Sequence, residues 1–78
     1  MNTLTHPQAH DVSCTKELIV VTLLDGRTIS APLNWFPKLY KANQAQLDNW
    51  QLLGEGEDIY WPDINEDLSV IGLLYGSQ

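Results

Sequence analysis

The sequence predicts a small α+β domain, in which an antiparallel sheet of three to five strands carries two or three short helices on one face. Short runs rich in Val, Ile and Thr are separated by Gly-containing turns, a pattern typical of antiparallel strands. Short segments that begin with capping residues indicate helices. A length of 78 residues allows one domain, and an apolar share of 44% is ordinary for a globular protein.

The chain divides into an arm and a domain. Residues 1–10 are polar and include Pro7, so we expect a flexible N-terminal arm, followed by a single α+β domain over residues 11–78. The arm lacks the basic start and apolar run of a signal peptide, and no apolar run approaches the roughly 20 residues that span a membrane. Cys14 is the single cysteine, which excludes an internal disulfide and fits a reducing compartment. We therefore expect a cytoplasmic protein.

The first three strands are expected over residues 11–14, over 18–24, and after the Asp25-Gly26 turn. A two-residue turn would place polar residues opposite apolar ones. A loop of three residues, Leu24 to Gly26, places Gly26 where a left-handed conformation is wanted. It also gathers five apolar side chains on one face, namely Ile19, Val21, Leu23, Ile29 and Ala31. We therefore predict the three-residue loop, because a slip of one residue would turn this face to water.

Helical segments are expected next. Pro32 ends the preceding strand, and residues 33–41 are expected to be irregular or a short helix capped by Asn34. Asn43, with Gln46 three residues later, predicts a capped helix over residues 43–50.

The last part of the chain is expected to contain two strands and a helix. Residues 50–53 and 58–61 are typical of strands, and Gly54 and Gly56 lie in the link between them. Asp63 or Asn65 is expected to turn the chain after the second strand. Ser69 then predicts the start of a helix over residues 70–75, which Gly76 is placed to end.

The net charge of −6 is unevenly placed. Residues 1–43 carry a balance of +1, whereas residues 44–78 contain seven carboxylates, no Lys and no Arg. Such a surface repels phosphate, so direct nucleic-acid binding is not expected. A basic protein partner is expected instead. The alternative is that the carboxylates simply keep the domain soluble.

Residues with catalytic or metal-binding chemistry are few. Cys14 has no histidine base on a predicted rigid element. The run Asp63-Ile64-Asn65-Glu66-Asp67 matches the start of a calcium loop, but Leu68 stands where Gly is needed and Leu74 where Glu is needed. We expect no enzymatic activity, no cofactor and no bound metal.

Aromatic residues are the remaining candidates for function. Trp35, Trp50 and Trp61 are expected to serve mainly as core anchors. Trp35 and Phe36 are adjacent and cannot easily both point inward. One of them is therefore expected at the surface beside Tyr40, in an apolar patch of the kind that binds partners.

These segments together resemble a known family. The residues of this chain that carry the resemblance are Asp25-Gly26-Arg27-Thr28-Ile29-Ser30-Ala31-Pro32-Leu33, Trp35-Phe36-Pro37, Asn49-Trp50, Gly54, Gly56, Ile59, Trp61-Pro62, Glu66-Asp67-Leu68-Ser69-Val70 and Gly72-Leu73-Leu74. In this order they resemble the small bacterial domain-of-unknown-function 2442 family, over roughly residues 11–76.

The resemblance implies a compact α+β domain, found alone or fused to a helix-turn-helix domain. It also implies a gene beside that of a second short protein, an arrangement similar to toxin–antitoxin pairs. It implies no catalytic residues. This chain has a longer polar start and no room for a helix-turn-helix, so any role linked to DNA would be indirect.

These observations favour a non-catalytic protein-interaction module, antitoxin-like or regulatory, that binds a basic partner protein. The residues expected to contact the partner are Trp35, Phe36, Lys38, Trp61, Asp63, Glu66 and Asp67. One alternative is a metal-dependent enzyme component that uses the acidic segment 63–67. Another is a structural homodimer formed through an unpaired edge strand, so both a monomer and a homodimer remain open.

Overall fold

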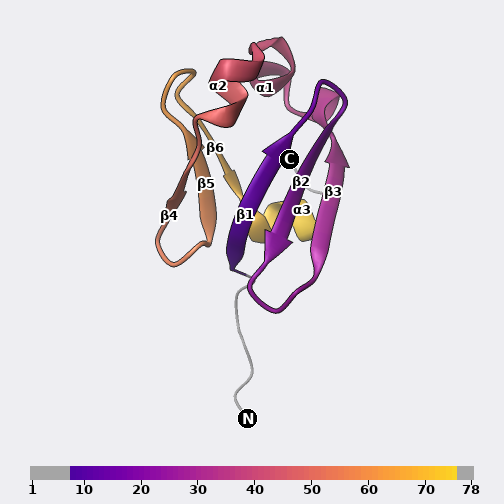
Figure 1. The fold of residues 1–78 in the computed structure, drawn as a ribbon, viewed down its shortest axis with the longest axis vertical. Coiled ribbons are helices and arrows are strands. Elements are labelled where there is room, and N and C mark those ends of the chain that lie inside the picture. Colours follow the sequence, from indigo (N-terminus) through magenta and orange to yellow (C-terminus); the bar gives the residue numbers. More distant parts are fainter. Residues whose placement is uncertain (1–7, 76–78) are drawn as a thin grey trace.

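The computed structural model describes residues 8–75, which form two three-stranded antiparallel sheets, three short α-helices and one 3-10 turn (Figure 1). The first sheet has the order β1-β2-β3, with bounds Ala9–Cys14, Leu18–Leu23 and Thr28–Pro32. The second has the order β4-β5-β6, with bounds Gln51–Leu53, Asp58–Trp61 and Glu66–Ser69. The helical segments are η1 (Leu33–Trp35), α1 (Pro37–Lys41), α2 (Gln44–Asp48) and α3 (Val70–Tyr75).

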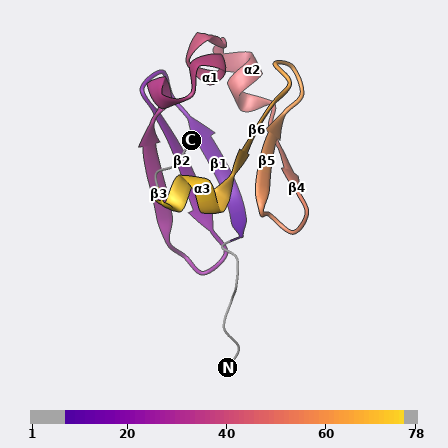
Figure 2. The ribbon, with the colours of Figure 1, turned by 180° about the vertical axis from the view of Figure 1, so that it is seen from behind.

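The expected α+β class is confirmed. The strands form two sheets of three strands each, whereas the sequence predicted a single sheet of three to five strands. The added strand is β6, which follows a turn at Asn65 with a φ of 52°. The helices also do not share one face. In Figures 1 and 2, α1 and α2 lie at one end of the two sheets, whereas α3 crosses between β3 and β6.

The start of the domain differs from the prediction by two residues. Ala9 and His10, which were expected in the arm, belong to β1, where Ala9 is buried and pairs with Leu23. Residues 1–7 of that arm, and Gly76 as the end of the last helix, lie outside the described residues.

The β2–β3 hairpin has the predicted three-residue loop. Val21 pairs with Ile29 and Ile19 with Ala31. The Leu23 N–H donates to the Arg27 carbonyl over 2.8 Å, and Gly26 has a φ of 96°. The expected apolar face is therefore formed, and its members are buried or half-buried.

Two of the three predicted helix caps are present. The Asn43 side chain accepts from the Gln46 N–H over 2.8 Å, while the Gln46 side chain accepts from the Asn43 N–H over 3.1 Å. The Ser69 hydroxyl accepts from the Gly72 N–H over 3.2 Å, at the start of α3. Side chains therefore satisfy backbone donors at the start of both α2 and α3.

The third prediction, that Asn34 caps a helix, was wrong. Asn34 lies inside η1, where it caps no helix. The helix α1 begins after Phe36 with Pro37 in its first turn, and no side chain caps it. Proline is well suited to this place, because it lacks the N–H that a cap would have to satisfy.

Gly56 joins the two sheets. The Ala9 N–H of β1 donates to the Gly56 carbonyl over 2.6 Å, and Gly56 itself has a φ of 88°. A β-carbon at this position would lie 2.5 Å from the Ala9 carbonyl oxygen. Glycine is therefore required here both for the backbone conformation and for the close approach of β1.

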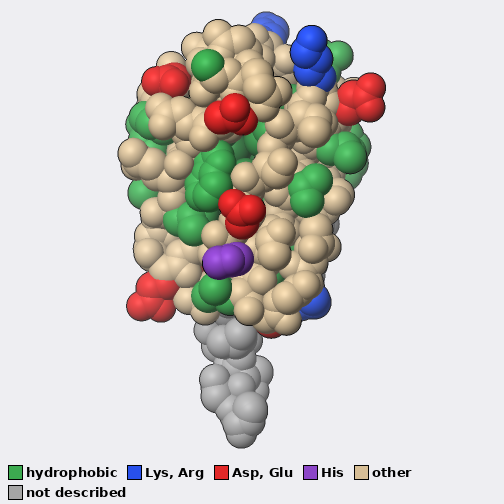
Figure 3. Space-filling model, in the orientation of Figure 1, with side chains coloured by type: hydrophobic (Ala, Val, Ile, Leu, Met, Phe, Trp, Pro, Cys, Tyr) green, Lys and Arg blue, Asp and Glu red, His purple; other side chains and the backbone are tan. Residues whose placement is uncertain are grey.

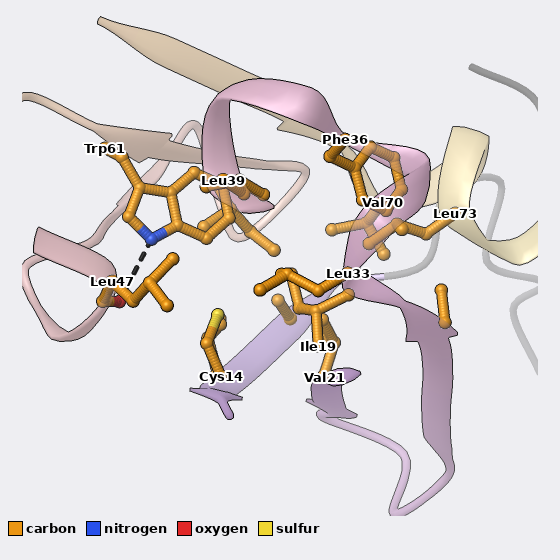
Figure 4. Packing of buried hydrophobic residues seen from close by; sticks show 14 of the residues in the cluster. Cys14, Ile19, Val21, Leu33, Phe36, Leu39, Leu47, Trp61, Val70 and Leu73 are labelled. Carbon is orange, nitrogen blue, oxygen red and sulfur yellow. Dashed lines mark hydrogen bonds between the residues drawn. The ribbon is translucent and has the colours of Figure 1, made fainter. Parts of the chain in front are cut away.

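The core lies between the two sheets, beneath the helices (Figure 4). Ile19 and Val21 enter it from β2, and Ile59 and Trp61 enter it from β5. The Trp61 indole N–H donates to the Leu47 carbonyl over 3.1 Å, so its polar atom is satisfied within the core. No helix among residues 8–75 is long and apolar enough to cross a membrane.

Candidate functional site

A groove of about 490 Å³ is lined by β6 and α3. The helix α3 faces the viewer in Figure 2. We call this groove the β6 groove. It is lined by Phe36 and Pro37, by all four residues of β6, and by Ile71, Gly72 and Leu73 of α3. The groove therefore brings together two stretches that are separate in the sequence, residues 36–37 and the continuous run from β6 into α3.

The floor of the β6 groove is apolar. Phe36 and Leu73 have exposed fractions of 5% and 7%, and Figure 4 shows the Phe36 ring beside Val70 and Leu73. Ile71, by contrast, is 37% exposed. Because α3 is apolar on nearly all sides, the domain covers one side of it and leaves Ile71 and Leu74 at the surface.

Two acidic residues of β6 line the groove. Glu66 and Asp67 are consecutive on β6, so their side chains project to opposite faces of the sheet. Glu66 lies on the half-buried face and forms an ion pair with Lys38, in which Nζ and Oε1 are 3.8 Å apart. Asp67 is on the exposed face.

The adjacent aromatic residues divide as the sequence predicted. Trp35 is 42% exposed and Phe36 is buried, with ring centroids 6.5 Å apart in an edge-to-face arrangement. Tyr40 is also exposed, at 57%. Trp35 thus lies at the surface against the ring that forms the groove floor.

Five of the seven predicted contact residues gather at the β6 groove or beside it, namely Trp35, Phe36, Lys38, Glu66 and Asp67. Trp61 does not, because it is completely buried and cannot contact a partner. Asp63 is exposed in the β5–β6 turn, where its Oδ2 accepts from the Asn49 side chain over 3.2 Å. It does not line the groove.

The acidic segment 63–67 does not form the metal site that one alternative requires. Within residues 8–75, no group of three or more His, Cys, Asp or Glu side chains is placed to hold a metal ion. The strand geometry explains this, since Glu66 and Asp67 point to opposite faces and Asp63 bonds to Asn49.

Cys14 is a buried member of the core. Burial and, to a smaller extent, the negative charge of Asp48 raise the pKa of the Cys14 thiol to about 11. The thiol is therefore protonated at neutral pH, whereas nucleophilic cysteines need a lowered pKa.

A second cavity, of about 580 Å³, lies beside α2 and is lined by Lys16, Leu33, Tyr40, Ala42, Asn43, Gln44 and Leu47. Two of its polar side chains already have partners within the domain. Asn43 is engaged in the capping box, and the Gln44 amide donates to the Cys14 carbonyl and to Asp48, each over 2.9 Å. The β6 groove is therefore the stronger candidate, because its apolar floor adjoins carboxylates and an exposed helix face.

Leu68, Ile71 and Leu73 of the groove were not among the predicted site residues. A signal for α3 was present, because the run from Val70 to Leu74 is apolar except for Gly72 and so short a helix cannot bury every side. For β6 the signal was weak, because Glu and Asp are depleted in strands.

The face opposite α3 carries scattered carboxylates. In Figure 3, Lys and Arg side chains are near the two ends of the molecule, whereas carboxylates are spread over the face. At one end, Arg27 is bound to Asp25 in the β2–β3 loop, with Nε and Oδ2 2.8 Å apart. This local pair leaves the acidic balance of residues 44–78 unchanged.

Comparison with known proteins identifies the family but no activity. The family model described as "Protein of unknown function (DUF2442)" matches residues 9–78, so the chain belongs to this family. A crystal structure at 2.75 Å resolution, of a protein of unknown function from Rhodospirillum rubrum ATCC 11170, is similar with a TM-score of 0.80 and 28% sequence identity. The alignment covers 94% of this chain and 90% of that one. No curated protein matches the sequence.

Proposed function

We propose that this chain, a member of a family whose function is unknown, is a non-catalytic protein-interaction module of the cytoplasm. Its β6 groove binds a basic segment of a partner protein. One observation carries this proposal: the apolar floor at Phe36, the exposed apolar Ile71 and the acidic strand β6, with Asp67 on its exposed face, line the same groove.

Each part of the groove has a physical role in the proposed complex. Burial of apolar surface against Phe36, Ile71 and Leu73 supplies affinity, at roughly 25 cal/mol per Å². The exposed Asp67 carboxylate attracts Lys or Arg, because Glu66 is already paired with Lys38. The acidic balance of residues 44–78 strengthens that attraction at longer range. Electrostatics of this kind mainly set the encounter rate and the choice of partner.

The proposed role is regulatory, in the manner of an antitoxin that binds a basic partner and holds it. The gene arrangement implied by the family resemblance supports this role. The buried, protonated Cys14 thiol is consistent with a module that acts by binding rather than by covalent chemistry.

The test is a capture experiment with two matched variants. The immobilised full chain, Ile71→Lys and Leu53→Lys are each exposed to extract of the native cell at low salt. Ile71 and Leu53 are exposed to nearly the same extent, 37% and 39%, but Leu53 lies on β4, away from the groove. We expect the wild type and Leu53→Lys to retain one basic protein in stoichiometric amount, and Ile71→Lys to lose it.

Two results would contradict the proposal. One is equal retention by Ile71→Lys, and the other is the absence of any stoichiometric basic protein. Light scattering of the purified chain supplies a further check. If Ile71→Lys abolishes a homodimer of the wild type, the occupant of the groove is a second copy and not a basic partner.

A further inference from the structure

The outer edge of β6 borders the groove, and the register identifies its outward groups. In the β4-β5-β6 order, β6 pairs with β5 alone. The Val70 N–H donates to the Glu57 carbonyl over 3.0 Å, which continues the register of Ile59 with Leu68 and Trp61 with Glu66.

Hydrogen-bonded and non-hydrogen-bonded pairs alternate in an antiparallel ladder. If Val70 is in a bonded pair, so are Leu68 and Glu66, and the main chains of these residues face β5. Asp67 and Ser69 are then in the non-bonded pairs, so their N–H groups and the Asp67 carbonyl point away from β5. Both of these residues line the groove.

We propose that the partner segment binds in extended conformation, as an additional strand on β6. This inference rests on the proposed function and names the form of the segment that the groove accepts. The main chain of one partner residue would exchange two hydrogen bonds with Asp67, and a neighbouring carbonyl would accept from the Ser69 N–H.

The side-chain pattern of the partner follows from strand alternation. A residue directly opposite Asp67 has its side chain on the same face as the Asp67 carboxylate, so Lys or Arg is favoured there. The residues before and after it point to the other face of the sheet, towards Leu68 and the groove floor at Phe36. The recognised pattern is therefore apolar–basic–apolar.

The charge of β6 also distinguishes this occupant from a second copy of the chain. Pairing of β6 with its own twin would bring Glu66 and Asp67 close to the same carboxylates of the other copy. Like charges on adjacent strands are destabilising, and charged edge strands resist such self-association. A basic segment meets no such repulsion.

The test uses three peptides of eight residues and the full-length chain. The first has Val-Lys-Val at its centre, the second is identical but carries a methyl group on the main-chain nitrogen of the lysine, and the third has the same composition with the lysine moved to one end. Amide chemical shifts of the isotope-labelled chain report where each peptide binds, and titration gives the affinity.

We expect the first peptide to shift the amides of Asp67 and Ser69. The methylated peptide should bind about tenfold more weakly, because it lacks a main-chain donor. Asp67→Asn keeps the main chain of β6 and should weaken the first peptide by about threefold. The peptide with the displaced lysine should bind more weakly than the first.

Different failures would overturn different parts of the proposal. Equal affinity of the methylated and unmethylated peptides would overturn strand addition, and so would the absence of shifts at millimolar peptide. The use of the groove by a basic partner is judged separately, by retention in the capture experiment. If the peptide shifts amides beside α2 instead of β6, the second cavity is the binding site and the inference is wrong.

Discussion

Gly56 is the residue whose substitution should disturb the fold most directly. Its φ of 88° is unfavourable for a residue with a side chain, and a β-carbon would meet the Ala9 carbonyl. We expect Gly56→Ala to lower the free energy of unfolding by about 3 kcal/mol. Gly26→Ala is the matched control, because Gly26 has a φ of 96° but a β-carbon there would meet no atom within 4 Å.

Urea unfolding of both glycine variants measures the difference. Gly26→Ala carries the backbone strain alone and should cost about 1 kcal/mol. Equal losses in the two variants would show that the contact between Gly56 and β1 contributes nothing to stability.

Cys14 gives the domain a pH dependence in the alkaline range. The pKa of this thiol is raised from 9.0 to about 11 in the folded chain, so the unfolded chain loses the proton first as the pH rises. The stabilisation is therefore complete below about pH 9 and is lost between about pH 9 and pH 11, amounting to about 2 kcal/mol. Cys14→Ala should not show this alkaline loss of stability. Urea unfolding of both chains near pH 9 and near pH 11 measures the difference. The same alkaline loss in the variant would assign the effect to other groups.

Single residues also show how far sequence reasoning reaches at the site. The division of Trp35 and Phe36 between surface and core was predictable, because two adjacent large rings cannot share one side of the backbone. Trp61 was assigned to the partner surface incorrectly. The available signal was its position two residues after Ile59 on a strand, which places both side chains on the buried face.

The helix α2 tests what its cap contributes. We expect Asn43→Ala to lower the free energy of unfolding by about 1 kcal/mol, because it removes the side-chain oxygen that accepts from the Gln46 N–H. Asn34→Ala is the matched control, since Asn34 is exposed and caps no helix, and it should change stability by less than about 0.5 kcal/mol. Thermal or urea unfolding of the pair is the measurement. A larger loss in Asn34→Ala would contradict the assignment of the caps.

Elements with a strong local signal could be predicted, whereas those determined by tertiary contacts could not. Parity fixed the register of the β2–β3 hairpin, because one choice alone placed the apolar side chains on one face. The strand β6 has no such pattern and is formed by pairing with β5, where Leu68 lies opposite the buried Ile59. The β6 groove could not be predicted for the same reason, since β6 forms one of its walls.

At the scale of the whole molecule, the two sheets and α3 enclose one core and leave one side of α3 uncovered. The same packing that buries Val70 and Leu73 leaves Ile71 and Leu74 exposed beside β6. In the proposed complex, the carboxylates of residues 44–78 favour a basic partner at that surface. The architecture thus places exposed apolar side chains within the acidic half of the chain.

Titration of the captured partner with the wild type, Ile71→Lys and Leu53→Lys tests the central claim most directly, at about 0.05 M and about 0.5 M salt. The proposed β6 groove predicts that Ile71→Lys weakens binding by about tenfold or more, as expected for a substitution at an interface anchor. It predicts that Leu53→Lys leaves affinity nearly unchanged and that high salt weakens the wild-type complex. Equal affinities for the three chains, independent of salt, would contradict the claim that this groove binds a basic segment.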